Sequence, residues 1–142
     1  MHSDPIHLKR YIDYIKLASL PVQLRAFGTC LIGNRIYVIG GDSSFEEKLK
    51  SEGRYNTFCW YKYRGNMYVY DIPTDKWQLN TPKFKERANH TVQYDSGKIY
   101  ILGGKRLAKN KKVEYLEDCI EVYDTLSQKI WKDYANPHQA VN

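Results

Sequence analysis

A basic cluster lies between a Gly-Gly doublet at residues 103–104 and an acidic stretch. The cluster consists of Lys105, Arg106, Lys109, Lys111 and Lys112. The acidic stretch that follows contains Glu114, Glu117 and Asp118. Cationic groups on a rigid scaffold can bind carboxylate or phosphate, with roughly 1.5–3 kcal/mol from each charge-assisted hydrogen bond. Because charged loops are commonly only solvated, two interpretations remain: a contact site for an acidic partner, or a solvated surface.

Aromatic side chains concentrate within a long, charge-rich segment at residues 42–66. They are Tyr55, Phe58, Trp60, Tyr61 and Tyr63. Exposed aromatic residues near arginine are typical of protein-binding hot spots, which makes Trp60 and Tyr61 candidate contacts. The alternative is that residues 58–63 only begin the next strand. Residues 45–50 also have the spacing of a helical turn that would pair Glu46 with Lys50 at i and i+4.

The residue pattern offers little for catalysis. The histidines are His2, His7, His90 and His138, and no Ser-His-Asp order, His-x-x-x-His pair or glycine-rich phosphate loop is present. The cysteines, Cys30, Cys59 and Cys119, are scattered and form no Cys-x-x-Cys motif, which argues against a disulfide framework and a structural zinc site. We therefore predict no catalytic residue, no metal, no cofactor and no enzymatic activity.

A repeated sequence pattern predicts the strands that position these side chains. Residues 35–41 recur as residues 98–104, an offset of 63 (99−36), and each copy is an apolar strand ending in Gly-Gly. Each is followed by an aromatic-Asp strand and then a tryptophan. The structural repeat positions are Gly40, Gly41, Gly103, Gly104, Tyr70, Tyr123, Trp77 and Trp131. Internal repeats of this size indicate modules that bury their faces by stacking on neighbours.

Turn signals and hydrophobic runs predict four strands in each copy. The first copy has strands at 26–32, 35–39, 68–72 and 77–79, and the second has strands at 92–94, 99–102, 120–124 and around Trp131. Gly33-Asn34 is a tight hairpin signal. The matching turn in the second copy, Asp95-Ser96-Gly97, is predicted to be one residue longer than Gly33-Asn34. With this extra residue, Arg87 aligns with Arg25 at the start of the first strand of each repeat.

The two copies resemble the kelch repeat over roughly residues 14–133. That resemblance implies an all-β fold, a partial kelch β-propeller with two four-stranded blades and a stray outer strand from a preceding blade. The expected divisions are a flank (1–13), the stray strand and linker (14–24), repeat 1 (25–80, with the long loop 42–66), repeat 2 (81–133) and a tail (134–142). Propellers close with about four to eight blades. Two blades therefore leave open faces, through which self-association is expected.

The resemblance also implies where a partner binds. In kelch proteins that bind acidic peptides, an arginine at the position of Arg25 and Arg87 often points into the binding face. The alternative is a salt bridge or a backbone contact between neighbouring blades. The implied function is a non-enzymatic protein-interaction module. It could be a truncated substrate-binding part of a BTB-kelch ubiquitin-ligase adaptor, or a competitor of one. Alternatives are an actin-associated structural protein and an inert remnant of a longer kelch gene.

Composition limits the other classes of partner. The 142 residues carry a net charge of +6, which suits acidic partners without identifying nucleic acid. No apolar run approaches the roughly 20 residues needed to cross a bilayer, and residues 1–5 lack a signal-peptide pattern. We expect a cytoplasmic protein that binds neither nucleic acid nor membrane. Its composition is compatible with the shortened kelch-like proteins of poxviruses, which would place it in the host cytoplasm. It is equally compatible with a piece of an animal kelch protein.

Overall fold

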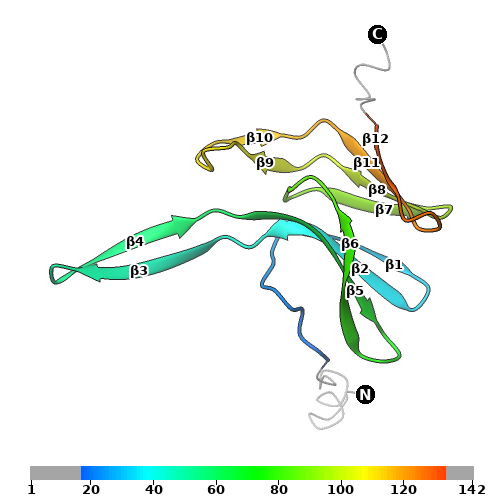
Figure 1. Cartoon of the computed structure of the whole chain (residues 1–142), viewed down its shortest axis with the longest axis horizontal. Coiled ribbons are helices and arrows are strands. Elements are labelled where there is room, and N and C mark those ends of the chain that lie inside the picture. Colours follow the sequence, from blue (N-terminus) through cyan, green and yellow to red (C-terminus); the bar gives the residue numbers. More distant parts are fainter. Residues whose placement is uncertain (1–16, 134–142) are drawn as a thin grey trace, which may run out of the picture.

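A computed structural model describes residues 17–133, whose regular elements are all antiparallel β-strands (Figure 1). The first sheet contains, in spatial order, β1 (Gly28–Ile32), β2 (Arg35–Asp42), β5 (Tyr63–Asp71) and β6 (Lys76–Lys83). The second contains, in the equivalent order, β7 (Thr91–Asp95), β8 (Lys98–Leu102), β11 (Ile120–Asp124) and β12 (Ile130–Asp133). The predicted all-β class is confirmed, and residues 17–133 form no closed ring of sheets.

A hairpin lies between the second and third strands of each sheet. The first hairpin pairs β3 (Phe45–Ser51) with β4 (Arg54–Trp60), and the second pairs β9 (Lys105–Leu107) with β10 (Glu114–Leu116). Both point to the same side of the molecule, and the β3–β4 hairpin reaches further out (Figure 1). These hairpins carry most of the charged and aromatic residues that the sequence singles out.

The helical turn predicted for residues 45–50 is wrong. These residues form β3, in which Glu46 lies opposite Cys59 and Lys50 lies opposite Tyr55. The turn at Glu52-Gly53, where both residues have positive φ, closes the hairpin. The third strand of the first sheet starts at Tyr63, earlier than residue 68, because its first residues pair with the end of β2. Of the alternative start at residues 58–63, only Tyr63 belongs to this strand, since residues 58–60 lie in β4.

The core lies between the two sheets. Ile39, Met67 and Val69 of the first sheet pack against Ile99, Ile101 and Tyr123 of the second, and Phe84 joins them from the connection between β6 and β7. All seven side chains are buried. Full burial of an aliphatic or aromatic side chain stabilises by about 1.5–3 kcal/mol, so this contact holds the two sheets face to face.

The alignment of the first strands predicted from sequence is one residue out of register. Gly28 lies opposite Ile39 and Thr91 opposite Leu102, an offset of 63 on both strands (91−28 and 102−39). Asp95 pairs with Lys98, so the turn in the second sheet consists of residues 96 and 97. It has the same length as the turn at 33–34, whereas the sequence predicted one extra residue.

The same register corrects the equivalence of the two arginines. The backbone pairing of Arg25 with Asp42 in the first repeat corresponds to the backbone pairing of Ala88 with Lys105 in the second. The positive φ of Ala26 likewise corresponds to that of Asn89. Ala88, not Arg87, is therefore the equivalent of Arg25. Because side chains alternate between faces along an extended chain, this one-residue difference sends the two arginines in different directions.

The outer strands contain a second shift of this kind. Trp77 lies opposite Tyr70, whereas the residue opposite Tyr123 is Ile130 and not Trp131. Trp77 packs on Tyr70 with ring centroids 4.9 Å apart, and Ile130 packs against the core. The two tryptophans are thus not equivalent repeat positions, and Trp131 lies on the opposite face of its sheet from Ile130.

The stray strand predicted at residues 14–24 falls partly outside the described residues. Positions 14–16, the flank 1–13 and the tail 134–142 lie outside them, and residues 17–24 form no strand. Ala18 instead contacts the first sheet. Its N–H donates to Asp75 Oδ1 over 2.8 Å, and its carbonyl accepts from Trp77 Nε1 over 2.9 Å.

Candidate functional site

The connection between β6 and β7, residues 84–90, fixes the bases of both hairpins. The Arg87 backbone accepts a hydrogen bond from the Gly41 N–H (2.8 Å) and donates one to the Arg64 carbonyl (3.1 Å). The Ala88 backbone both donates to and accepts from Lys105 (2.9 and 2.7 Å). Gly41 and Arg64 stand where the chain enters and leaves the first hairpin, and Lys105 begins the second. One short segment therefore sets the relative positions of the hairpins.

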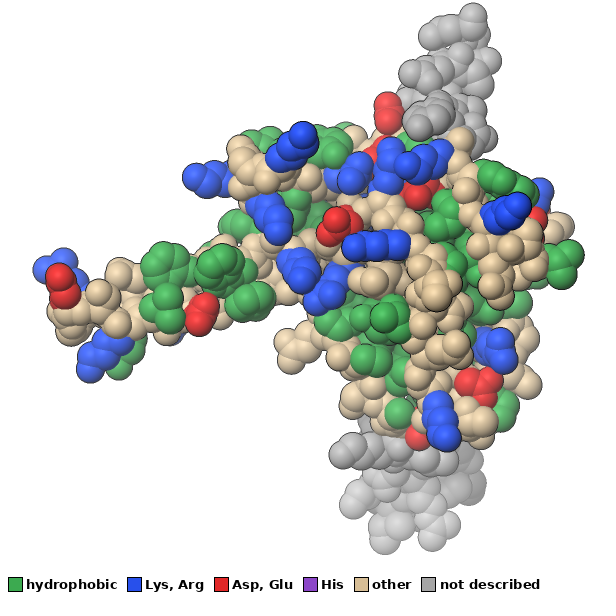
Figure 2. Space-filling view, in the orientation of Figure 1, with side chains coloured by type: hydrophobic (Ala, Val, Ile, Leu, Met, Phe, Trp, Pro, Cys, Tyr) green, Lys and Arg blue, Asp and Glu red, His purple; other side chains and the backbone are tan. Residues whose placement is uncertain are grey.

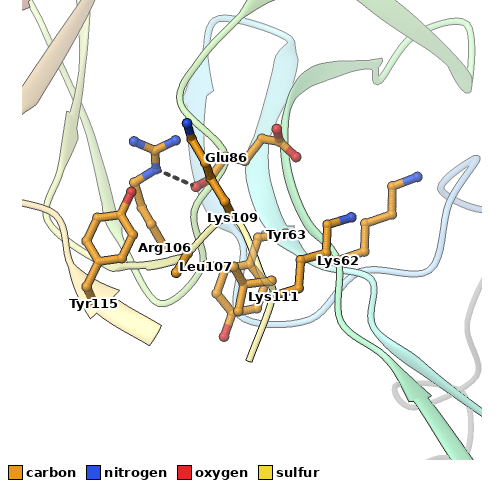
Figure 3. Close-up of a pocket in the computed structure, with 9 residues that line it drawn as sticks. Lys62, Tyr63, Glu86, Arg106, Leu107, Lys109, Lys111 and Tyr115 are labelled. Carbon is orange, nitrogen blue, oxygen red and sulfur yellow. Dashed lines mark hydrogen bonds between the residues drawn. The ribbon is translucent and has the colours of Figure 1, made fainter. Parts of the chain in front are cut away.

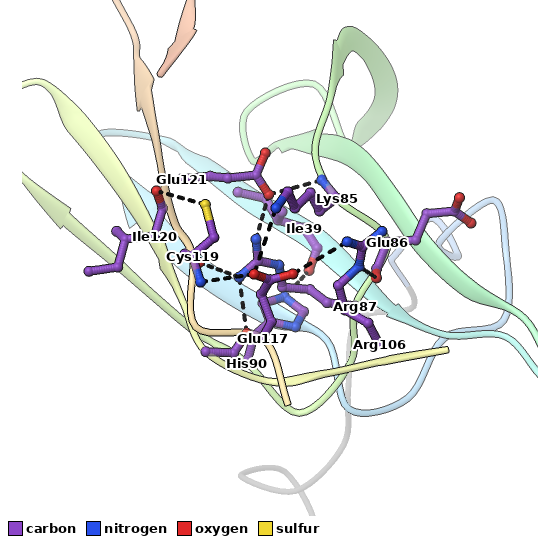
Figure 4. Close-up of polar contacts among 11 residues, drawn as sticks. Ile39, Lys85, Glu86, Arg87, His90, Arg106, Glu117, Cys119, Ile120 and Glu121 are labelled. Carbon is purple, nitrogen blue, oxygen red and sulfur yellow. Dashed lines mark hydrogen bonds and ion pairs between the residues drawn. The ribbon is translucent and has the colours of Figure 1, made fainter. Parts of the chain in front are cut away.

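The Arg87 side chain is enclosed beneath this connection (Figure 4). Its Nη2 forms an ion pair with Glu121 Oε1 over 2.5 Å, and both side chains are 1% exposed. Its Nη1 donates to the carbonyls of Gly103 (3.0 Å) and Cys119 (3.3 Å). The structure thus places this predicted contact residue in the interior. Its ion pair lies within the second repeat, and only its backbone contacts the first repeat, through Gly41 and Arg64.

Glu117 organises a second set of ion pairs beside Arg87 (Figure 4). Its carboxylate lies 3.3 Å from Arg106 Nη1 and 3.7 Å from Lys85 Nζ, and it accepts a 2.8 Å hydrogen bond from the Cys119 N–H. Burial alone would raise the pKa of Glu117, but the Cys119 hydrogen bond and the charges of Lys85, Arg87 and Arg106 together lower it. Glu117 therefore stays ionised and holds Arg106 in place.

His90 also has a structural position. Its Nε2 lies 2.7 Å from the Ile39 carbonyl and so carries the proton, while its buried Nδ1 has no hydrogen-bond partner among the described residues. Glycines leave room for this side chain, because a Cβ on Gly40 would lie 2.7 Å from the ring atom Cε1 and a Cβ on Gly104 would lie 2.8 Å from the Cβ of His90. Burial, and to a lesser degree the Arg87 charge, lower the pKa of His90. His90 is therefore a neutral, packed side chain.

Acidification is expected to destabilise the fold through His90. The unfolded histidine binds a proton below its ordinary pKa of about 6.5, whereas the folded one binds it only at lower pH. The unfolded state then holds more protons, so the free energy of unfolding falls as pH decreases through this window. Denaturant unfolding between about pH 8 and 5 measures this slope. His90→Gln, which retains a donor for Ile39, should flatten it; an unchanged slope would contradict the assignment.

A groove opens between the two hairpins (Figure 3). It has a volume of 480 Å³. Its lining combines cations from the link between β4 and β5 and from the second hairpin, one carboxylate and apolar surface, namely Lys62, Tyr63, Glu86, Arg106, Leu107, Ala108, Lys109, Lys111 and Tyr115. Within the described part of the chain, Lys62, Lys109 and Lys111 form no ion pair. The groove therefore presents three ammonium groups available to a ligand.

Polar and ring contacts hold the walls of the groove together. The buried Tyr63, the first residue of β5, donates through its hydroxyl to the Glu114 carboxylate of the second hairpin. Burial, this hydrogen bond and the Glu114 charge raise the pKa of Tyr63. Arg106 donates through Nε to the Glu86 carbonyl (3.1 Å) and lies 5.8 Å from the centre of the Tyr115 ring. Tyr63, Arg106 and Tyr115 are thus held in place in the groove wall.

The predicted basic cluster divides into two groups. Lys105 pairs with Glu114 over 3.8 Å, and Arg106 pairs with Glu117, so their charges are engaged within the chain. Lys109, Lys111 and Lys112 lie exposed at the end of the β9–β10 hairpin. Side chains of Lys and Arg gather over both hairpins and the region between them (Figure 2). Within the predicted cluster, the available positive charge therefore comes from the end of the β9–β10 hairpin.

The other predicted contact residues lie around the base of the first hairpin. Arg25 is 69% exposed, pairs with Asp42 over 3.3 Å and lines a 420 Å³ hollow with Tyr61. Trp60 donates through Nε1 to Glu47 (3.0 Å) and stacks on Phe45. Tyr61 also lines a hollow with Lys111 and Lys112, which connects this region to the second hairpin.

Sequence reasoning missed the remaining part of the groove lining. Lys62, Tyr63, Glu86 and Tyr115 come from three segments far apart in the chain. Lys62 adjoins the candidate Tyr61, and Glu86 adjoins the candidate Arg87, but nothing in the linear pattern places these residues together. Their proximity follows from the hydrogen bonds of residues 84–90 to both hairpins.

Residues 17–133 contain neither a cluster of metal-binding side chains nor a membrane-spanning helix. No group of three or more His, Cys, Asp and Glu side chains is placed there to share a metal ion. Nor do these residues include a helix whose length and apolar character would let it cross a membrane.

Comparison with known proteins identifies a similar fold. No protein-family model and no curated protein matches the chain. A solved structure described as "Structure of YjhT" is similar, with a TM-score of 0.58 and 16% sequence identity, and the match covers 84% of this chain. It covers only 40% of the other chain, so this protein spans about two fifths of its length. At this identity the similarity concerns the fold alone.

Proposed function

We propose that this protein is a non-enzymatic protein-interaction module whose two sheets are blades of a kelch-type propeller. It binds an acidic peptide segment of a protein partner in the groove between the β3–β4 and β9–β10 hairpins. Support for the fold assignment comes from the equal strand order of the two sheets, their face-to-face packing and the repeated Gly-Gly doublets. In the cytoplasm the module would serve as the substrate-binding part of a ubiquitin-ligase adaptor or as its competitor.

The observation that carries the proposal is the charge of the groove. Lys62, Lys109 and Lys111 line it without an ion pair in the described chain, against one lining carboxylate, Glu86. Ammonium groups bind carboxylates as flexible point charges and do not require one fixed geometry. This favours recognition of several acidic residues over a single, tightly oriented one.

Apolar surface in the groove narrows the ligand further. Leu107, Ala108 and the Tyr115 ring lie between the cations. A volume of 480 Å³ is at the lower end of the roughly 300–1,000 Å³ typical of ligand pockets, enough for a few side chains. The favoured ligand is therefore a short extended segment that combines Asp and Glu with an apolar residue.

Charge reversal in the groove tests this function. The probe is a fluorescent peptide that alternates Asp or Glu with Leu, and binding is measured by anisotropy. The triple variant Lys62→Glu, Lys109→Glu, Lys111→Glu should bind on the order of 30-fold more weakly, about 2 kcal/mol, because attraction becomes repulsion. Binding by the unmodified protein should also weaken as salt is raised.

The matched control changes net charge equally but elsewhere. Lys48, Lys76 and Lys129 are exposed and do not line the groove, so their triple replacement by Glu should reduce binding only through long-range charge. A peptide with Asn and Gln in place of Asp and Glu should not bind. Equal loss of affinity in both triple variants would reject the groove as the binding site.

A further inference from the structure

A second groove, called the edge groove below, follows β6, the strand at one edge of the first sheet. Its volume is 730 Å³, and its lining includes every residue from 76 to 82. Successive side chains of a strand point to opposite faces of a sheet. An unbroken run of residues can therefore line one groove only if that groove follows the edge of the strand. The edge groove thus borders the backbone of β6 as well as its side chains.

The two sides of the edge groove differ in chemistry. Gln78 and Asn80 lie on the core side of the sheet, because they are opposite core residues of β5. The second sheet adds Tyr123 on this side. Trp77 and Leu79 lie on the other side, where Leu79 is 54% exposed. A strand placed along β6 would therefore meet polar, uncharged side chains on one side and apolar ones on the other.

The free edge of β6 lacks the usual protection against strand pairing. Within the described residues β6 pairs only with β5, so alternate residues of β6 direct their N–H and C=O groups away from the sheet. Natural edge strands are commonly blocked by charged side chains or by proline. Residues 77–82 carry no charge, and Pro82 comes only one residue before the end of β6. This edge is therefore open to an added strand.

Positive charge marks both ends of this edge. Lys76 and Lys83 are the first and last residues of β6, and neither forms an ion pair within residues 17–133. The other charged residues that line the edge groove, Arg35 and Asp71, pair with each other over 3.4 Å. Asp75, next to Lys76 in the chain, accepts two hydrogen bonds within the protein. A complementary strand therefore carries a carboxylate at each end.

A second copy of β6 fits this edge poorly. Full antiparallel overlap of β6 with itself would place Lys76 of one copy opposite Lys83 of the other, at both ends of the pair. Like charges directly opposite each other destabilise paired strands. The edge therefore favours a strand of different sequence.

We propose that the edge groove binds an extended segment of a partner protein, which adds to β6 as an antiparallel strand. A segment of 8 residues matches the length of β6. Its middle alternates apolar residues, on the side of Leu79, with hydroxyl or amide residues on the side of the second sheet, and both its ends are acidic. Main-chain hydrogen bonds supply affinity, and the alternating side chains supply specificity. The proposal is independent of the acidic-peptide function, because the two grooves share no lining residue.

Fluorescence anisotropy with the labelled peptide Asp-Thr-Val-Thr-Val-Thr-Val-Asp tests the proposal on the 142-residue chain. Paired antiparallel over the whole of β6, this peptide places each Asp opposite a lysine and its valines opposite Trp77, Leu79 and Thr81. We expect a Kd below about 1 mM. Only alternate residues of the peptide donate to β6. N-methylation of one alternate set should therefore abolish binding, and N-methylation of the other set should weaken it far less.

Two double variants locate the binding site. Gln78→Glu, Thr81→Glu places a carboxylate diagonally opposite each acidic end of the peptide and should weaken binding at least about tenfold. Thr57→Glu, Gln93→Glu makes the same chemical changes at exposed strand positions outside the edge groove and should change binding little. The circular dichroism spectra of both variants should match that of the unmodified protein.

The outcomes also separate this proposal from the acidic-peptide function. The triple variant Lys62→Glu, Lys109→Glu, Lys111→Glu should retain binding of the Thr-Val peptide, since none of its residues lines the edge groove. Absence of binding by the unmodified protein, equal effects of the two methylated peptides, or equal losses in the two double variants would each overturn the proposal. So would a dimer of the chain that dissociates in Gln78→Glu, Thr81→Glu, because a second copy would then occupy the edge.

Discussion

Replacement of Arg87 by methionine is expected to lower the free energy of unfolding by about 3–5 kcal/mol, the typical cost of breaking a buried ion pair. Methionine fills much of the same space, but it leaves the Glu121 carboxylate 1% exposed and without its cation. It also removes the donor for the carbonyls of Gly103 and Cys119. The lost interactions lie at the segment that joins the two sheets, so both sheets should be destabilised together. Unfolding should therefore remain a single transition, with its midpoint at a lower denaturant concentration.

Two further variants separate charge from packing. Arg25→Met removes an exposed arginine whose pair with Asp42 should contribute at most about 1 kcal/mol. The double variant Arg87→Met, Glu121→Leu removes both buried charges and should recover most of the stability, since apolar replacement of a whole buried pair is often neutral. Urea unfolding followed by circular dichroism measures all three. Equal stability of Arg87→Met and Arg25→Met would contradict the role assigned to Arg87.

The contrast between these arginines also shows how far sequence could go. The repeat predicted the two four-stranded sheets and their Gly-Gly ends, because these depend on hydrophobic runs and turn residues. It did not predict the two-stranded hairpins β3–β4 and β9–β10. Aligning Arg87 with Arg25 required an extra residue in the turn at 95–97, whereas Asp95 is paired within the strand. A slip of one residue reverses every side chain on a strand. That error exchanged an interior position for a surface one.

The groove was predictable only in part, for a different reason. Lys109 and Lys111 were found because they are close in sequence, and the same reasoning included Lys105 and Arg106. Hairpin pairing places Arg106 opposite Tyr115 and Lys105 near Glu114, so neutralisation comes from the acidic stretch that follows. Lys62 joins the site from a distant segment. Pairing across the fold, which composition does not encode, decides which charges remain available.

Gly65→Ala is expected to destabilise the protein by about 3 kcal/mol, the upper part of the range for overpacking. A Cβ at this position would lie 2.0 Å from the carbonyl oxygen of Phe84 and 2.9 Å from its carbonyl carbon. Both are backbone atoms, so no side chain can rotate to make room. The Phe84 N–H also donates to the Gly65 carbonyl over 2.8 Å, which means that the clash opposes a hydrogen bond between the same residues.

Gly53→Ala is the control for this substitution. Gly53 has φ +77° and no heavy atom within 4 Å of an added Cβ, so its replacement should cost only the roughly 1–2 kcal/mol of a left-handed alanine. If Gly65→Ala were no more destabilising than Gly53→Ala, the close approach at Phe84 would be wrong.

The two variants should also differ in peptide binding. Displacing Phe84 moves the segment that carries Glu86 and Arg87 and that positions both hairpins. Gly65→Ala should therefore weaken acidic-peptide binding. Gly53→Ala changes only the end of the β3–β4 hairpin and should leave acidic-peptide binding unchanged.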